Sequence, residues 1–170
     1  MVLNSARYDR RSLLGLIAVA GGVVLAGCNS APAAPVADKA AEALPGTKKM
    51  LVYRDPECGC CTAWAEIAKK AGYDVTVESR PDMPAIKVRH GVPAELASCH
   101  TVIVAGYVVE GHVPMQHIDK LLGDKPRDIV GLAVPGMPRG SPGMEMPDGS
   151  VDAFDVMAFD ATGAAVVYTA

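Results

Sequence analysis

The feature that constrains this chain most is a cluster of three thiols within four residues. Cys58, Cys60 and Cys61 follow a short apolar run at 50–53 and precede a helical pattern that ends at Gly72. This order predicts a strand, a tight loop and a helix, with the sulfurs at the helix N-terminus. Unpaired N–H groups and the helix dipole favour negative charge there, so we expect lowered thiol pKa values. Such a cluster indicates either a redox site or a soft-metal site.

The first 27 residues have the pattern of an export signal. Arginines precede an apolar segment at 13–26, which is too short to span a membrane comfortably. The segment ends in Leu-Ala-Gly-Cys28, which resembles the lipobox of bacterial lipoproteins and predicts lipidation of Cys28. The alternative is a signal anchor in which Cys28 is one more small residue. Arg10-Arg11 also resembles a twin-arginine signal, which would imply export in the folded state.

The remainder divides into a tether and one domain. Residues 28–47 are rich in Ala and Pro and have almost no large apolar side chains, so we expect a flexible tether after the lipidated cysteine. Residues 48–170 are the length of a single domain. Without residues 1–27 the chain carries 13 basic and 18 acidic side chains, a net charge of −5, which does not favour nucleic acid. We predict a membrane-anchored lipoprotein on the periplasmic or extracytoplasmic side.

The cysteine spacing disfavours purely structural disulfides. Apart from Cys28, the chain has Cys58, Cys60, Cys61 and Cys99, an even number that allows three pairings outside the cytoplasm. A bridge within the first three closes a very short loop and adds little stability. A bridge between adjacent cysteines would also be strained. Chemistry explains the crowding better than stapling does.

The pattern after the thiols predicts alternating strands and helices. We expect a second strand, a short helix, a hairpin and a last helix beginning at Pro114, followed by a long loop rich in Gly, Pro and Met and by a C-terminal hairpin. The corresponding ranges are 73–78, 85–89, 101–104 with 107–110, 115–122, 131–149, and 153–159 with 164–168. The predicted fold class is α/β.

This β-α-β-α-β-β-α order, with thiols at the first helix, resembles the thioredoxin fold. Cys58 and Cys61 form a C-x-x-C at the position of that fold's redox motif. Thioredoxin-like proteins carry a cis-proline just before the third strand, whereas this chain has Ser98-Cys99-His100 there. The alignment would place Cys99 beside the other three thiols. A redox enzyme favours proline at this position, and a thiolate followed by an imidazole favours a metal.

Five motifs together resemble the CopG-type copper-resistance family of periplasmic metal-binding proteins, long classed as a domain of unknown function. The resemblance implies a thioredoxin-like fold and copper handling, and it implies no demonstrated enzyme activity. The motifs are Asp-Pro-Glu-Cys-Gly-Cys-Cys at 55–61, Gly-Val-Pro at 91–93, Ser-Cys-His-Thr at 98–101, Glu-Gly-His-Val-Pro at 110–114, and Gly-Leu-Ala-Val-Pro-Gly-Met-Pro at 131–138.

The donor set favours copper. Thiolates select Cu(I), Zn(II) or iron–sulfur clusters, and structural zinc sites use two separated cysteine pairs. Cu(I) accepts two or three sulfurs, and one thiolate can bridge two ions, so we predict Cu(I) at Cys58, Cys60, Cys61 and Cys99, with multinuclear binding as a hypothesis. Two alternatives stay open: a thiol–disulfide oxidoreductase using Cys58 and Cys61, and a structural zinc or iron–sulfur site. Predicted partners are copper ions and other copper carriers or efflux components of the envelope.

Imidazoles and thioethers are further candidate donors. His100 is a copper ligand, a donor to a ligand, or a packing residue. We expect His112 to make a turn hydrogen bond, with contact to the metal as the alternative, and the other two histidines to be surface residues. In the long loop at 131–149, Met137 and Met144 are either additional copper ligands or parts of a lid over the thiols.

Overall fold

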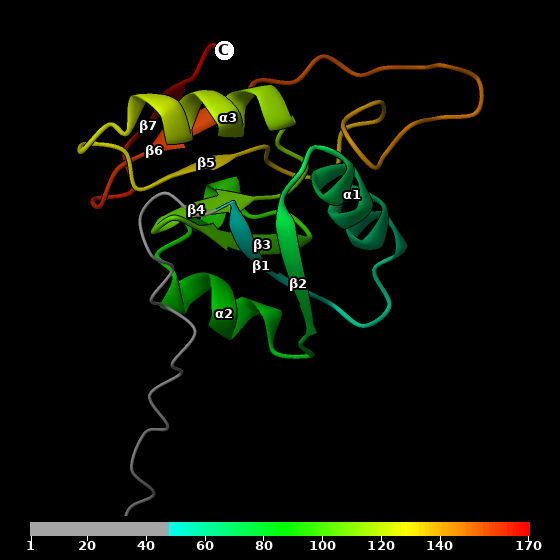
Figure 1. The fold of residues 1–170 in the computed structure, drawn as a ribbon, viewed down its shortest axis with the longest axis horizontal. Helices are drawn as coiled ribbons and strands as arrows, with labels where there is room; N and C mark the ends of the chain where they lie inside the picture. The colour runs from blue at the N-terminus through cyan, green and yellow to red at the C-terminus, as the bar shows by residue number, and fades with distance from the viewer. Residues whose placement is uncertain (1–47) are drawn as a thin grey trace, which may run out of the picture. The chain divides into compact units, whose positions relative to one another are not determined.

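The apolar runs of the sequence form one mixed β-sheet. The structure, a computed structural model, describes residues 48–170, so the predicted signal, Cys28 and the tether lie outside the described residues (Figure 1). Two neighbouring pairs, β1 with β2 and β4 with β5, are parallel, and the other pairs are antiparallel. The strands lie in the order β2-β1-β3-β4-β5-β6-β7. Their bounds are β1 (Lys49–Arg54), β2 (Asp74–Ser79), β3 (His100–Val104), β4 (Tyr107–Glu110), β5 (Gly131–Ala133), β6 (Met157–Phe159) and β7 (Ala165–Val167).

Three α-helices connect the described strands. They are α1 (Gly59–Lys70), α2 (Met83–Arg89) and α3 (Met115–Asp124), and a 3₁₀ turn covers Ala94–Leu96. Helix α1 buries Trp64 and Ala68 as the spacing predicts, whereas Ala71 is exposed because the helix ends there. Of the helices in residues 48–170, none is long and apolar enough to cross a membrane.

Alternation along the strands divides the core between the two faces of the sheet. Val52 and Val102 pack in the cluster that contains residues of α1 and α3, while Ile103 packs in the cluster that contains residues of α2. Figure 1 shows α2 and α3 on different sides of the central strands. The same alternation sends His100 of β3 toward α1 and Thr101 toward α2. Consequently, neighbouring residues at the start of β3 serve two separate environments.

The predicted element order is confirmed as far as α3, and the C-terminal hairpin extends the sheet as β6 and β7. The prediction of an unbroken loop over 131–149 is wrong at its start, where Gly131–Ala133 forms β5. This strand is buried throughout and pairs with β4 on one side and β6 on the other. Its pairing partners, rather than its own short Gly-Leu-Ala sequence, make it a strand. The more specific resemblance to thioredoxin stays a prediction.

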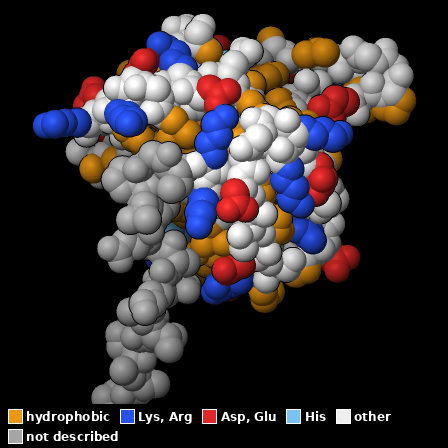
Figure 2. All heavy atoms as spheres, in the orientation of Figure 1, with side chains coloured by type: hydrophobic (Ala, Val, Ile, Leu, Met, Phe, Trp, Pro, Cys, Tyr) orange, Lys and Arg blue, Asp and Glu red, His pale blue; other side chains and the backbone are white. Residues whose placement is uncertain are grey.

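The visible surface carries charges of both signs. On the face shown in Figure 2, Lys and Arg side chains alternate with Asp and Glu side chains over the described residues. Several close opposite-charge pairs are exposed, including Lys69 with Glu66 and Lys120 with Asp124. Exposed pairs of this kind contribute little to stability. The buried polar groups therefore bear more directly on function.

Candidate metal centre

The loop before α1 is folded around the side chain of Arg54. Its Nη1 donates to the carbonyl oxygens of Asp55, Pro56 and Cys58 at 3.0, 3.1 and 3.3 Å. These bonds turn the chain at the end of β1 and deliver Cys58 to the N-cap position of α1. There the Cys58 sulfur accepts a hydrogen bond from the backbone N–H of Cys61 at 3.3 Å. The sulfurs thus lie at the helix N-terminus, as the sequence predicts.

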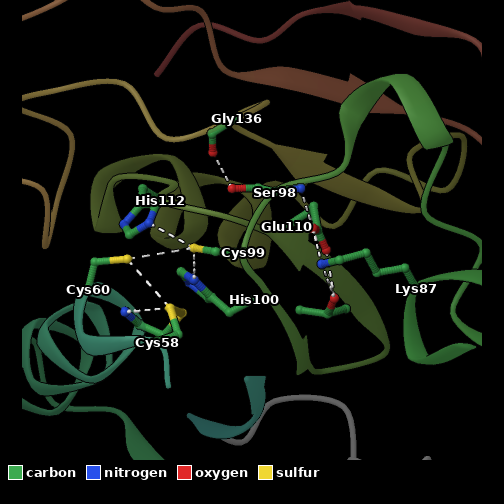
Figure 3. Close-up of polar contacts among 11 residues, drawn as sticks. Cys58, Cys60, Lys87, Ser98, Cys99, His100, Glu110, His112 and Gly136 are labelled. Carbon is green, nitrogen blue, oxygen red and sulfur yellow. Dashed lines mark hydrogen bonds and ion pairs between the residues drawn. A yellow bond between two sulfur atoms is a disulfide. The ribbon is translucent and has the colours of Figure 1, made fainter. Parts of the chain in front are cut away.

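The fourth sulfur joins these three from β3. Arg54 of β1 pairs with His100 of β3, so the end of one strand meets the start of the other. Cys99 Sγ lies 4.0 Å from Cys60 Sγ, and Cys60 Sγ lies 3.5 Å from Cys58 Sγ (Figure 3). The sulfurs of Cys58, Cys60, Cys61 and Cys99 all lie within 4.8 Å of one another. The predicted proximity of Cys99 to the other thiols is confirmed.

The four sulfurs differ in redox state. Cys58 and Cys61 form a disulfide, whereas Cys60 and Cys99 are free thiols. The bridged pair is the C-x-x-C noted in the sequence. While it is bridged, its sulfurs cannot act as thiolate ligands, so only two of the four cysteines are available in this state.

The free thiol of Cys99 has an unfavourable environment for negative charge. Burial, followed by the proximity of Cys60, raises the pKa of Cys99 to about 12. Cys99 is therefore a neutral thiol in the metal-free protein, whereas the sequence suggested a fourth thiolate. A cation bound beside Cys99 Sγ would reverse this preference, because it stabilises the thiolate.

His112 belongs to the site, and the expected turn hydrogen bond is wrong. The side chain is fully buried. Its Nδ1 lies 2.7 Å from the carbonyl oxygen of Pro142, and its Nε2 lies 3.0 Å from Cys99 Sγ. A carbonyl can only accept, so Nδ1 carries the proton and the lone pair of Nε2 faces the sulfur. Burial lowers the pKa of His112, which keeps the ring neutral. Histidines that bind metals are usually oriented in this way.

His100 adds a second imidazole beside Cys99. Its Nδ1 lies 3.3 Å from Cys99 Sγ, and its ring packs 4.9 Å from Trp64 and 5.0 Å from His112. The Nε2 atom is buried and has no hydrogen-bond partner among the described residues. Burial, then the proximity of His112 and Lys87, holds the pKa of His100 well below its usual value. Cys99, His100 and His112 form a second group of donors within 4.8 Å of one another.

The long loop after β5 packs against the thiols. Gly143 has φ +83°, and a Cβ there would lie 2.8 Å from the Trp64 backbone nitrogen and 3.0 Å from the Cys60 carbonyl oxygen. The part of the loop near Gly143 therefore touches the first turn of α1. Met144 is half-buried next to this contact, whereas Met137 is 55% exposed and lines a cavity with Phe154. Ligand roles for Met137 and Met144 stay predictions.

The remaining two histidines are half-buried rather than surface residues. The ring of His90 stacks on Tyr53 with 5.5 Å between centroids, and that of His117 lies 6.3 Å from Tyr168. Neither belongs to the two donor groups found in residues 48–170.

Two solved structures resemble this chain over most of its length. The one titled "Copper resistance protein copG- Form 1" is 47% identical, with a TM-score of 0.66. The alignment covers 70% of this chain and 93% of that chain. The chain belongs to the CopG family of copper resistance proteins. The "Form 2" structure of the same title is 46% identical, with the same TM-score and coverage of 70% and 94%.

A family profile also matches part of this CopG chain. Its description is "Protein of unknown function, DUF411", and it spans residues 96–144. The matched segment contains Cys99, His100, His112 and the loop that packs on α1, but not the thiols before and within that helix. No curated protein matches the chain.

Proposed function

We propose that this CopG-family protein binds Cu(I) through Cys58, Cys60, Cys61 and Cys99, and sequesters or relays it in copper resistance. The observation that carries the proposal is the convergence of four sulfurs from two separate segments within 4.8 Å. Four soft donors at this spacing suit Cu(I) better than hard cations. The relatives, whose titles name copper resistance, support the choice of copper.

The imidazoles extend this donor set. His112 directs an unprotonated Nε2 toward Cys99, and His100 lies on the other side of the same sulfur. Sulfur and nitrogen donors around Cys99 give more coordinating atoms than one Cu(I) requires, which supports binding of more than one ion. Bound copper would supply the positive charge that stabilises the Cys99 thiolate.

The full set of four requires the reduced protein. Opening the Cys58–Cys61 bridge with an added dithiol transfers two electrons and two protons to the protein and leaves two thiols, while the dithiol becomes a disulfide. The reduced chain then offers four thiols, and the bridged chain offers two. We therefore expect reduced protein to take up more Cu(I) per chain than bridged protein.

A Cu(I) titration under a competing chelator tests the proposal. The reduced protein should bind copper tightly, and Cys99→Ser should lower retained copper while circular dichroism remains that of a folded chain. Met137→Leu and Met144→Leu keep all four cysteines and test the thioethers separately. Unchanged copper in Cys99→Ser would remove this residue from the site. Zinc or iron in protein purified anaerobically without added metal would support the structural zinc or iron–sulfur alternative instead.

Thiol–disulfide exchange is the second candidate, because Cys58 and Cys61 are bridged at the start of α1. Helix N-termini stabilise thiolates and so assist exchange. Insulin reduction by the metal-free protein measures this activity. Rapid turnover together with weak Cu(I) binding would place exchange first.

The predicted signal and Cys28 support a membrane-anchored position on the periplasmic or extracytoplasmic side. Copper carriers or efflux components of the envelope would then be the partners that exchange copper with it. Incorporation of labelled fatty acid into the full chain, and its loss in Cys28→Ala, tests the anchor. A wild-type chain that incorporates no label would contradict it.

A further inference from the structure

A buried carboxylate on the opposite side of β3 contacts the residues that flank Cys99. Glu110, the last residue of β4, is 0% exposed. Its Oε1 accepts from the backbone N–H of Ser98 at 2.7 Å and from Lys87 Nζ, and its Oε2 accepts from the Thr101 hydroxyl at 2.7 Å. In Figure 3 Glu110 and Lys87 lie to one side of Ser98, and the labelled cysteines lie to the other.

These contacts bracket the donor residues. Cys99 and His100 lie between Ser98 and Thr101, the two residues that Glu110 holds. The same carboxylate lies two positions before His112, which approaches Cys99 from the segment that follows β4. The Glu110 side chain thus connects the 98–101 segment, which carries Cys99 and His100, to the segment that carries His112.

The two segments are also pressed together by their backbones. The N–H of Gly111 donates to the carbonyl oxygen of His100 at 2.9 Å. Gly111 has φ +72°, and a Cβ there would lie 2.4 Å from Ser98 Oγ. The hydroxyl of Ser98 donates to the carbonyl oxygen of Gly136. No side chain fits between Gly111 and Ser98. The Glu110 carboxylate contacts the 98–101 segment on the face of the sheet that α2 covers, where it also meets Lys87.

Stability alone does not explain a charged pair at this position. Lys87 on α2 is 14% exposed and forms an ion pair with the fully buried Glu110. Removing two charges from water is costly, and apolar replacements of buried pairs are often equally stable or more stable. In some proteins buried ionic groups serve to specify one conformation. Here the contacts of the pair are with the 98–101 segment.

We propose that Glu110 is a positioning residue for the metal centre: by holding Ser98 and Thr101, it aims Cys99 and His100 at Cys60 and His112. The inference rests on the proposed function, since it concerns the alignment of copper donors. Glu110 itself touches no sulfur and needs no contact with the metal. Residues that orient metal ligands typically change metal affinity by about 10- to 100-fold when removed.

The test compares variants that destabilise the same face of the sheet. Glu110→Ala removes both acceptors, and Glu110→Gln keeps the shape but only one accepting oxygen. Ile86→Ala is the matched control, because Ile86 is fully buried on α2 in the same core and makes none of these polar contacts. Cu(I) affinity is measured by chelator competition on reduced full-length protein, with circular dichroism to confirm folding.

We expect Glu110→Ala to weaken Cu(I) binding by at least about tenfold, and Glu110→Gln by less, with Ile86→Ala unchanged. If Glu110→Ala does not fold, a loss in Glu110→Gln that exceeds the loss in Ile86→Ala supports the proposal. A loss in both Glu110 variants no larger than in Ile86→Ala overturns it.

A metal-free readout follows the alignment of the sulfurs directly. With Cys58–Cys61 bridged, diamide takes two hydrogens from Cys60 and Cys99 and joins them as a disulfide, which mass spectrometry detects. This bridge should form more slowly in the Glu110 variants than in Ile86→Ala, and equal rates overturn the proposal. The Cys99→Ser variant distinguishes failure of the copper site from failure of the positioning role. Unchanged copper binding in Cys99→Ser refutes the metal assignment. Reduced binding in Cys99→Ser together with normal binding in the Glu110 variants refutes only the positioning role.

Discussion

Lys87→Met removes the cation from a carboxylate that water cannot reach. Glu110 is 0% exposed and keeps two other donors, Ser98 and Thr101, each at 2.7 Å. Breaking one side of a buried ion pair typically costs about 3–5 kcal/mol. We therefore expect Lys87→Met to lower the free energy of unfolding by about 3–5 kcal/mol at pH 7.

Urea unfolding followed by the fluorescence of Trp64, the single tryptophan, measures this loss with the disulfide intact.

A double variant provides the control. Lys87→Met combined with Glu110→Gln removes both charges, so it should be more stable than Lys87→Met alone at pH 7. A penalty for Lys87→Met below about 1 kcal/mol, the range of exposed pairs, would refute the idea that this ion pair is buried away from water.

Three further predictions concern other parts of the domain. Burial and the 2.6 Å hydrogen bond to Asp119 raise the pKa of Tyr73, so the free energy of unfolding should fall as pH rises above about 10. Tyr73→Phe should lower the free energy of unfolding by about 1 kcal/mol. In thermal melts the variant should also show a smaller loss of stability above that pH. Gly143→Ala should destabilise more than Gly149→Ala in urea unfolding, because both have positive φ but only Gly143 approaches α1 closely; equal losses would contradict that contact. The raised pKa of Cys99 predicts slower alkylation at pH 8 in the folded, metal-free protein with Cys58 and Cys61 bridged than in the denatured chain, measured by peptide mass spectrometry.

The sequence predictions that were confirmed rest on local patterns of a few residues. The thiol loop lies between an apolar run and a helical repeat, and both can be recognised within a few residues. Residues 107–110 follow Gly106 as a β-prone segment, so the hairpin of β3 and β4 was also predictable. The proximity of Cys99 followed from strand order once that hairpin was assigned.

Features that depend on distant partners were missed. β5 is three residues long and buried on both faces, so it shows no alternation to identify it as a strand. His112 owes its orientation to a carbonyl 30 residues away, at Pro142. Glu110 had the sequence context of an ordinary strand end, and only the fold shows that it meets Lys87. One signal was available: Glu110 and His112 occupy a motif shared with the resembled family, which marks both positions without giving their roles.

The hydrogen bond between His112 Nδ1 and the Pro142 carbonyl oxygen couples the candidate metal centre to the loop that follows β5. A cation bound at His112 Nε2 would favour the tautomer with the proton on Nδ1, which is the one that bonds to the Pro142 carbonyl oxygen. Coupling of this kind is reciprocal, so any contact that fixes the loop at Pro142 would strengthen cation binding by the same factor. The loop that carries Met144 would then report occupancy through its own ordering. A partner protein that contacts this loop would then distinguish the metal-bound protein from the metal-free one.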